Sequence, residues 1–318
     1  MRASVVILAL FSAACAPPWE LLETNDTART MWSVWRAPSG AVLVGADNAG
    51  ILRRAPDGPV FEPVSIAESL TGEPAVEDQV VGLQGPSDVD VYAWTPTRFL
   101  HSTGGSFRVL PPPEDGTPWQ PLTVVTLSES DVLVTSTTPD DGDVLFQKFQ
   151  EGWTRARFSD GTFRQLDWVA ASSSGQVFAG HGREGRQTLV RRSGNTFEPV
   201  SGFAISGVRR AAVTSDRLWT LTERGVQAVR LDNLSTEDTD VFLPGAFYDI
   251  CAFPSGRVGV AGPSRGPLQP VWIFENGQWT NANVGTREVL RGIHCGGDGR
   301  LYVAGDHGML AREPSPPG

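Results

Sequence analysis

The sequence is poor in the residues and motifs on which many enzymes and nucleic-acid-binding proteins depend. Lys148 is the sole lysine, and the four histidines include no pair spaced two or four residues apart, which argues against a catalytic zinc site. No phosphate-binding loop, dinucleotide fingerprint or nucleophile elbow occurs. The formal net charge of -10 repels phosphate backbones. We therefore expect no nucleic-acid partner and no cofactor.

Long apolar runs are also lacking, apart from one near the N-terminus. The segment MRASVVILALFSAAC contains an apolar run from Val5 to Phe11, which is too short to cross a bilayer as a permanent helix and is typical of an export signal. The end of the segment, Ser12 to Cys15, resembles the lipobox of bacterial lipoproteins, in which the cysteine carries a lipid. Because Ser12 stands where that motif usually has Leu, cleavage after Ala14 without lipidation is one alternative, and an uncleaved segment is another.

The resemblance to a lipoprotein signal implies a location. We expect a bacterial cell-envelope protein anchored through lipid on Cys15, at the periplasmic or outer-membrane surface, or a secreted protein if Cys15 is not used. No second apolar span follows, so we expect membrane contact through the lipid alone. The expected division is a signal peptide over 1–14, a tether over 15–18, one domain over 19–313 and a disordered tail over 314–318.

What the sequence does contain is a repeat. A hydrophobic content of 40% permits a large core, while 35 glycines and 24 prolines disfavour long helices. A short turn followed by alternating apolar residues occurs seven times, for example as SGAVLVGAD from Ser39 and DGRLYVAGD from Asp298. One apolar residue recurs at the same phase, at intervals of about 40 to 49 residues as four-stranded propeller blades require: Val42, Val91, Val132, Val177, Leu218, Val258 and Leu301.

A second landmark indicates how the repeat array closes. About 20 residues after each turn a Gly-, Asn- or Asp-rich turn precedes an aromatic residue, but the last unit lacks this element. The segment PPWELLETN from Pro17, which contains Trp19, stands before the first full unit and has no other partner. We predict that it supplies the outermost strand of the seventh blade, which removes the open edges of the array. The copies of the aromatic landmark are Phe61, Phe107, Trp153, Phe197, Phe242 and Trp279.

Alternation of apolar and polar residues predicts four strands in each unit. In the first unit they span roughly 31–37, 42–46, 50–54 and 60–65. The predicted fold is all-β: a seven-bladed β-propeller with four-stranded antiparallel blades. A β-sandwich is the alternative, but it predicts neither a constant period nor an unpaired strand at Trp19.

From Trp19 to Arg312 the chain resembles the bacterial seven-bladed β-propeller superfamily, the broad group that includes WD40, YVTN and kelch-like repeats. The SGxVxVAG phrases carry this resemblance. The repeated Gly-His and Trp-Asp dipeptides of WD40 proteins, the double-Gly strand of kelch and the full sialidase box are not repeated here. The resemblance therefore implies the fold and no subfamily function.

The loops of a propeller fall on two faces. Turns between first and second strands and between third and fourth strands share one face, and here they are short and uniform, so we call it the short-turn face. Turns between second and third strands and blade-to-blade loops share the other, the variable-loop face, where long irregular loops favour recognition. The residues expected to bind on it are Trp94, Arg98, Trp119, Arg183, Arg186 and Arg265.

Several residues on the variable-loop face could carry chemistry. His181 with Glu184, and His307 with Asp306, offer a general base and a carboxylate near the channel, although solvated loops of the same composition are the alternative. Trp94, Trp119, Trp32 and Trp35 could form a platform for a sugar, or pack in the core. Asp140, Asp141 and Asp143 are spaced like part of a calcium loop, but the distal Glu is absent, so we expect no metal.

Two cysteines remain beyond the export signal. Cys251 and Cys295 form an even pair in an oxidising compartment and lie on the innermost strands of blades six and seven. They are one residue out of phase and so point to opposite faces of adjacent blades. If those two faces are packed against each other, a disulfide can form. If they are the outward faces of the blade pair, it cannot.

These observations favour a monomeric, non-enzymatic scaffold that binds a protein or peptide through the variable-loop face, with a glycan as a further possible ligand. The competing hypothesis is a propeller lyase or hydrolase that acts on a sugar or lactone with a His and carboxylate pair. A third is a structural envelope component.

Overall fold

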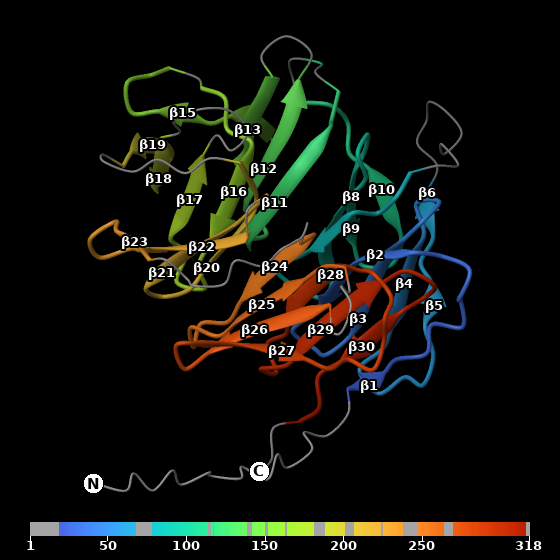
Figure 1. Cartoon of the computed structure of the whole chain (residues 1–318). Helices are drawn as coiled ribbons and strands as arrows, with labels where there is room; N and C mark the ends of the chain where they lie inside the picture. Colours follow the sequence, from blue (N-terminus) through green and yellow to red (C-terminus); the bar gives the residue numbers. More distant parts are fainter. Residues whose placement is uncertain are drawn as a thin grey trace, which may run out of the picture.

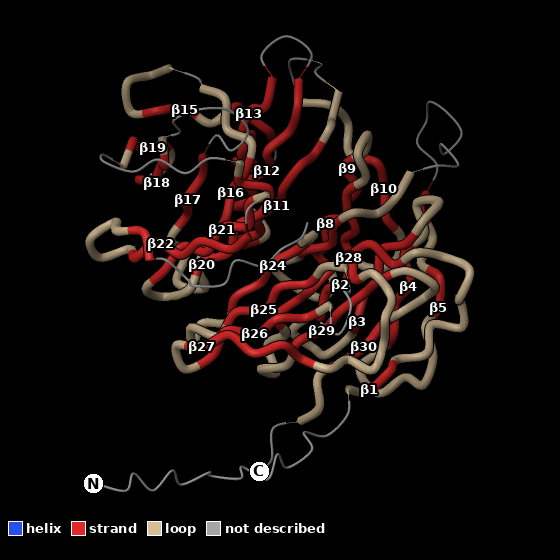
Figure 2. The backbone as a smooth tube through the Cα atoms, viewed as in Figure 1, coloured by secondary structure: helices blue, strands red, loops and turns tan. Residues whose placement is uncertain are grey.

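The computed structural model describes residues 19–67, 78–113, 116, 118–138, 142–149, 152–162, 164–180, 188–200, 207–223, 225–237, 247–263 and 270–315. Their strands form seven small sheets arranged in a ring, each built on four antiparallel strands, a seven-bladed β-propeller, which confirms the predicted fold (Figure 1). Among these described residues Figure 2 shows strands, loops and turns and no helix. Within the same ranges no helix has the length and apolar character of a membrane-spanning segment.

Each blade runs from an innermost strand at the channel to an outermost strand at the rim. From the channel outward, blade one consists of β2 (Met31–Arg36), β3 (Val42–Ala46), β4 (Ile51–Arg54) and β5 (Glu62–Pro63), and blade two of β7 (Gly82–Gln84), β8 (Asp90–Trp94), β9 (Phe99–Thr103) and β10 (Phe107–Val109). Blade three consists of β11 (Pro121–Ser128), β12 (Asp131–Thr138), β13 (Gly142–Phe149) and β14 (Gly152–Arg155). Blade four consists of β16 (Trp168–Ala171), β17 (Val177–Gly180), β18 (Leu189–Ser193) and β19 (Thr196–Pro199).

Blades five to seven follow the same order. Blade five consists of β20 (Val208–Val213), β21 (Arg217–Thr222), β22 (Gly225–Arg230) and β23 (Thr236–Glu237). Blade six consists of β24 (Asp249–Ala252), β25 (Val258–Ala261), β26 (Val271–Glu275) and β27 (Gln278–Ala282). Blade seven consists of β28 (Leu290–Cys295), β29 (Leu301–Gly305), β30 (Leu310–Arg312) and β1 (Glu20–Leu21). The strands of the first blade start and end within two residues of the predicted bounds.

The N-terminal strand closes the ring, as the missing landmark in the last repeat predicted. Strand β1 pairs antiparallel with β30, with Glu20 opposite Arg312 and Leu21 opposite Ala311, and the two lie side by side in Figure 1. The amide of Leu22 donates to the carbonyl of Leu310 over 2.9 Å, and Arg312 forms an ion pair with Glu20. The first and last described strands therefore belong to one sheet.

Two connecting segments fasten neighbouring blades, a feature the repeat pattern did not predict. Strand β6 (Ile66–Ala67) leaves blade one and pairs in parallel with β10 at the rim of blade two. Strand β15 (Arg157–Phe158) does the same between blades three and four. These additions cover two outer edges that would otherwise offer unpaired backbone groups.

The core lies between the blades rather than within any one of them. Each second strand packs against both neighbours, so β3, β8 and β29 are buried along their whole length. Because both faces of these strands are covered, they read as nearly continuous apolar runs. Each buried cluster accordingly draws its residues from two adjacent blades; one joins Tyr302 and Leu310 of blade seven to Met31 and Val44 of blade one.

Candidate functional site

The innermost strands of all seven blades surround a cavity of about 410 Å³ on the ring axis. Charged and titratable side chains that line it include Arg210, Asp249 and His294. None of these three was among the residues predicted to form a site. They lie on innermost strands, whereas the sequence predicted a site on the variable-loop face.

One position of each innermost strand is equivalent throughout the ring. In each blade this innermost residue pairs with the second-strand residue that lies three places after the recurring apolar residue. In blade one, Ser33 pairs with Gly45, which lies three places after Val42. We call this set the channel ring. Its members are Ser33, Gly82, Thr123, Trp168, Arg210, Asp249 and Gly292.

Small and polar members of the channel ring contact the next blade. The Ser33 hydroxyl donates to the carbonyl of Val80 in blade two over 2.8 Å, and Thr123 Oγ1 accepts from the amide of Val169 in blade four over 3.1 Å. A Cβ on Gly292 would lie 2.8 Å from the Trp32 carbonyl oxygen of blade one. The ring position is therefore a close contact between innermost strands.

Asp249 performs the same role between blades six and seven. Its Oδ2 accepts from the amide of Ile293 over 3.0 Å, and its Oδ1 accepts from the amide of Ile250 over 3.0 Å. Burial raises the pKa of the Asp249 carboxyl, although the charge of Arg210 acts in the opposite direction. Asp249 thus holds the two blades together and presents a carboxylate to the channel.

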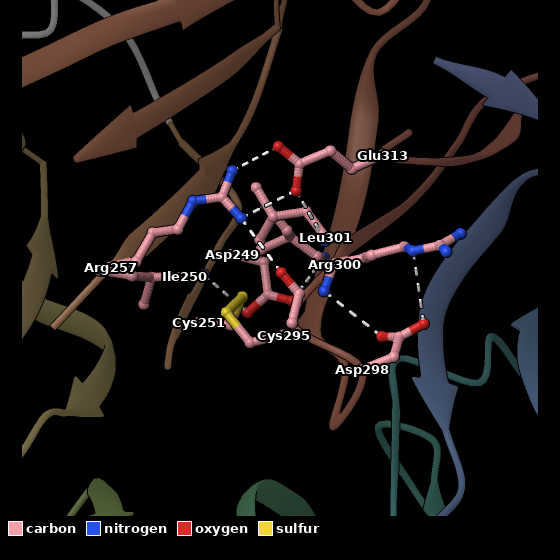
Figure 3. The surroundings of a disulfide bond; sticks show 11 residues. Asp249, Ile250, Cys251, Arg257, Cys295, Asp298, Arg300, Leu301 and Glu313 are labelled. Atoms are coloured by element: carbon pink, nitrogen blue, oxygen red, sulfur yellow. Dashed lines mark hydrogen bonds and ion pairs between the residues drawn. A yellow bond between two sulfur atoms is a disulfide. The ribbon is translucent and has the colours of Figure 1, made fainter. Parts of the chain in front are cut away.

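A disulfide joins the same two blades. Cys251 of β24 and Cys295 of β28 are bonded, with their Cα atoms 5.6 Å apart (Figure 3). Arg257 of blade six also reaches Glu313, which follows β30, and donates to it over 2.8 Å. Of the two arrangements that the sequence left open, the structure has the one in which the cysteine side chains face each other.

His294 lies beside the disulfide on the innermost strand of blade seven. Burial lowers its pKa to about 4, so the imidazole is neutral at pH 7. A hydrogen bond to the backbone of Arg36 and the charge of Asp298 act to raise this pKa, and the charge of Arg36 acts with burial to lower it. A neutral His lining a channel can accept or donate a hydrogen bond but carries no charge.

The variable-loop face carries a second cluster, formed by blades six, seven and one. Arg291 places its Cζ 5.0 Å from the ring centre of Trp32 and 4.9 Å from that of Tyr248. Two hydrogen bonds of 2.9 and 3.1 Å fix the guanidinium to Asp306, and the Trp32 indole donates to Asp47 over 2.6 Å. We call Trp32, Tyr248 and Arg291 the aromatic–arginine cluster.

Local backbone geometry turns two of these side chains toward the face. Trp32 lies at a register shift between Met31 and Ser33, and Arg291 lies at the equivalent shift between Leu290 and Gly292. Such bulges commonly re-aim a side chain at the end of a strand. Tyr248, which directly precedes β24, keeps 37% of its surface exposed.

The structure separates the predicted pair His307 and Asp306. Asp306 binds Arg291, whereas His307 Nδ1 lies 2.7 Å from Glu288 Oε2. This contact raises the pKa of His307. The His307 side chain is 74% exposed, so the pair lies on the surface of the face and not in the cavity.

Core packing, the alternative to a sugar platform, holds for three of the four tryptophans, and the expectation that Trp94 and Trp119 bind on the variable-loop face is wrong. Trp119 is 4% exposed and packs against Phe99 and Phe146, while its indole donates to the carbonyl of Pro111. Trp35 and Trp94 are buried as well. Trp35 and Trp94 also lie among the residues that line the cavity, and of the four only Trp32 belongs to the aromatic–arginine cluster.

The remaining predicted residues divide into two groups. Arg98 forms an ion pair with Asp78 at 3.2 Å, and buried Asp143 accepts from Thr137 over 2.6 Å. Among the described residues no group of three His, Cys, Asp or Glu side chains could hold a metal ion. Outside the described residues lie Cys15, Asp140, Asp141, His181, Arg183, Glu184, Arg186 and Arg265.

The sequence matches no protein-family model and no curated protein. It is similar in structure to YCF48 bound to a D1 peptide, with 16% identity and a TM-score of 0.67 over 94% of this chain and 96% of that one. It is also similar to virginiamycin B lyase from Staphylococcus aureus, with 12% identity and a TM-score of 0.65 over 92% of this chain and 97% of that one. A third similar structure is the WD40 propeller domain of Doa1, with 12% identity and a TM-score of 0.64 over 94% of this chain and 97% of that one. At these identities the likeness shows the shared propeller fold alone.

Proposed function

We propose that the protein is an exported, lipid-anchored propeller that binds a protein or peptide through its variable-loop face. The aromatic–arginine cluster is the observation that carries this proposal. Tyr, Trp and Arg are the residues that most often dominate binding energy at protein interfaces. Here one of each converges from three consecutive blades on the face that bears the irregular loops.

The cluster is held ready for binding. Asp306 fixes Arg291 through two hydrogen bonds, and Asp47 fixes the Trp32 indole through one. Side chains that are already ordered lose little conformational entropy when a partner arrives. Tyr248, the most exposed member, offers an apolar ring with a hydroxyl that can bond to a partner's backbone.

The proposed location rests mainly on the segment from Ser12 to Cys15, which resembles a lipobox. The bond between Cys251 and Cys295 supports it, because structural disulfides persist in oxidising compartments and are rare in the cytosol. A peptide partner has a precedent in the fold, since the similar propeller YCF48 is described with a bound D1 peptide.

Site-specific photocrosslinking in intact cells tests the proposal. A photoreactive residue at Tyr248 samples the variable-loop face, and one at Val89, which is 55% exposed, samples the short-turn face as a matched control. We expect a discrete crosslinked partner from position 248 that disappears in the Arg291→Ala background, and none from position 89. Equal crosslinking from both positions, or crosslinking indifferent to Arg291, would contradict the proposed face.

A lyase or hydrolase is the second candidate function. The His307 and Glu288 pair on the same face favours it, and virginiamycin B lyase is among the similar structures. Its test is turnover of a lactone and sugar panel by His307→Ala, compared with His101→Ala, which removes the pair formed with Asp90 at 2.5 Å. Loss of turnover in His307→Ala but not in His101→Ala would support an enzymatic function. Absence of turnover in the wild type would contradict it.

A further inference from the structure

Arg210 is the exception among the polar and charged members of the channel ring. Ser33, Thr123 and Asp249 use their side chains to bond the next blade, Gly292 permits a close approach, and Trp168 is buried between blades four and five. Arg210 instead places a long guanidinium at a position that lines the cavity. This residue type is not needed to join the blades.

Among the described residues the guanidinium of Arg210 has few partners. Its Nη1 donates to the carbonyl of Arg209 over 3.1 Å. No ion pair between residues that the structure describes includes Arg210, whereas its neighbour Arg209 binds Glu223 at 2.7 Å. A guanidinium has five N–H donors in a planar fork that matches a carboxylate. Toward the described residues Arg210 therefore uses one of its donors, and the others can bind a ligand.

Asp249 supplies the complementary group from the adjacent blade. It also lines the cavity, and each of its oxygens accepts one backbone amide, which leaves lone pairs for a further donor. The Arg210 guanidinium is close enough for its charge to lower the pKa of the Asp249 carboxyl, against the effect of burial. One guanidinium and one carboxylate together suit a ligand with both charges and disfavour a dianion such as phosphate.

We infer that this part of the cavity is a binding site for a small carboxylate that also carries an ammonium or N–H donor, that is, an amino acid or the C-terminus of a peptide. Arg210 would hold the carboxylate through its fork, and Asp249 would accept from the nitrogen. A cavity of about 410 Å³ lies in the range of small-molecule sites and admits a ligand of this size. The inference does not rest on the proposed function, because Arg210 lines the cavity whether or not a partner covers the face.

Isothermal titration of the purified protein tests the inference. The probes are diglycine, diglycine amide and inorganic phosphate. We expect diglycine to bind at least about tenfold more tightly than its amide, since a charge-assisted hydrogen bond is lost with the carboxylate. Two further probes separate the sources of the ligand: glycine, and a ten-residue peptide that ends in Gly-Gly. If glycine binds more tightly than the ten-residue peptide, the ligand is a free amino acid. If the peptide binds more tightly than glycine, the ligand is a peptide C-terminus that enters from the variable-loop face.

Two adjacent arginines provide matched variants. Arg210→Gln should weaken diglycine binding about tenfold or more, and Arg209→Gln, which changes an exposed and already paired arginine, should leave it unchanged. Arg210→Lys keeps the charge without the fork and should bind at an intermediate level, which preserves the test if Arg210→Gln does not fold. The inference is overturned if no probe binds, if acid and amide bind equally, if phosphate binds more tightly than diglycine, or if Arg210→Gln binds like the wild type.

Discussion

The disulfide between blades six and seven allows a worked prediction of stability. It closes a segment with a sequence separation of 44 residues. The loop-entropy relation then gives about 4 kcal/mol of stabilisation at 25 °C. For a domain of this size the entropy of unfolding makes each kcal/mol worth between about 1 and 2 °C. The Cys251→Ser/Cys295→Ser variant should therefore unfold about 6 °C below the wild type.

Thermal unfolding followed by circular dichroism measures this difference, with and without reductant. Reductant should lower the transition of the wild type to that of the double variant and leave the variant itself unchanged. Thiol titration of denatured, unreduced protein should detect neither Cys251 nor Cys295. A difference below about 1 °C, or two free thiols from these positions, would refute the reasoning that the bond fastens the ring.

Two other substitutions probe the channel. His294 has a pKa lowered to about 4, below the unfolded value of 6.5, so the unfolded state binds more protons and stability falls as the pH drops from about 6.5 to 4. His294→Gln should remove about 1 to 3 kcal/mol of this loss in urea titrations, whereas His307→Gln, at a site with a raised pKa, should not. Gly292→Ala should destabilise the fold by about 1 to 3 kcal/mol because the new Cβ meets the backbone of blade one, while Gly297→Ala, with nothing within 4 Å, should change it little.

The fold was predictable because its cause is local and repeated. Each second strand must be apolar on both faces to pack between blades, so residues such as Val42 and Leu301 recur at one phase. Ring closure followed from the one landmark missing in the last unit. The parallel additions β6 and β15 escaped prediction because they are two residues long and depend on contact with another blade.

The candidate site was predictable only in part. The variable-loop face was inferred from loop lengths, but the aromatic–arginine cluster joins positions from three blades, and the bulges at Trp32 and Arg291 leave no distinctive pattern in the sequence. Trp119 was predicted to bind because it is aromatic and near a long loop, yet packing buries it. The double arginine at 209 and 210, on an innermost strand, was the available signal for the channel site.

The most direct test of the central claim is the indole resonance of Trp32 in a ¹⁵N–¹H spectrum of the protein with and without the captured partner. Its Nε1 donates to Asp47 on the variable-loop face, whereas Trp219 is fully buried between blades five and six. A partner on the proposed face should shift the Trp32 signal and leave that of Trp219 in place. A shift confined to indoles far from this face, with Trp32 unchanged, would contradict the account.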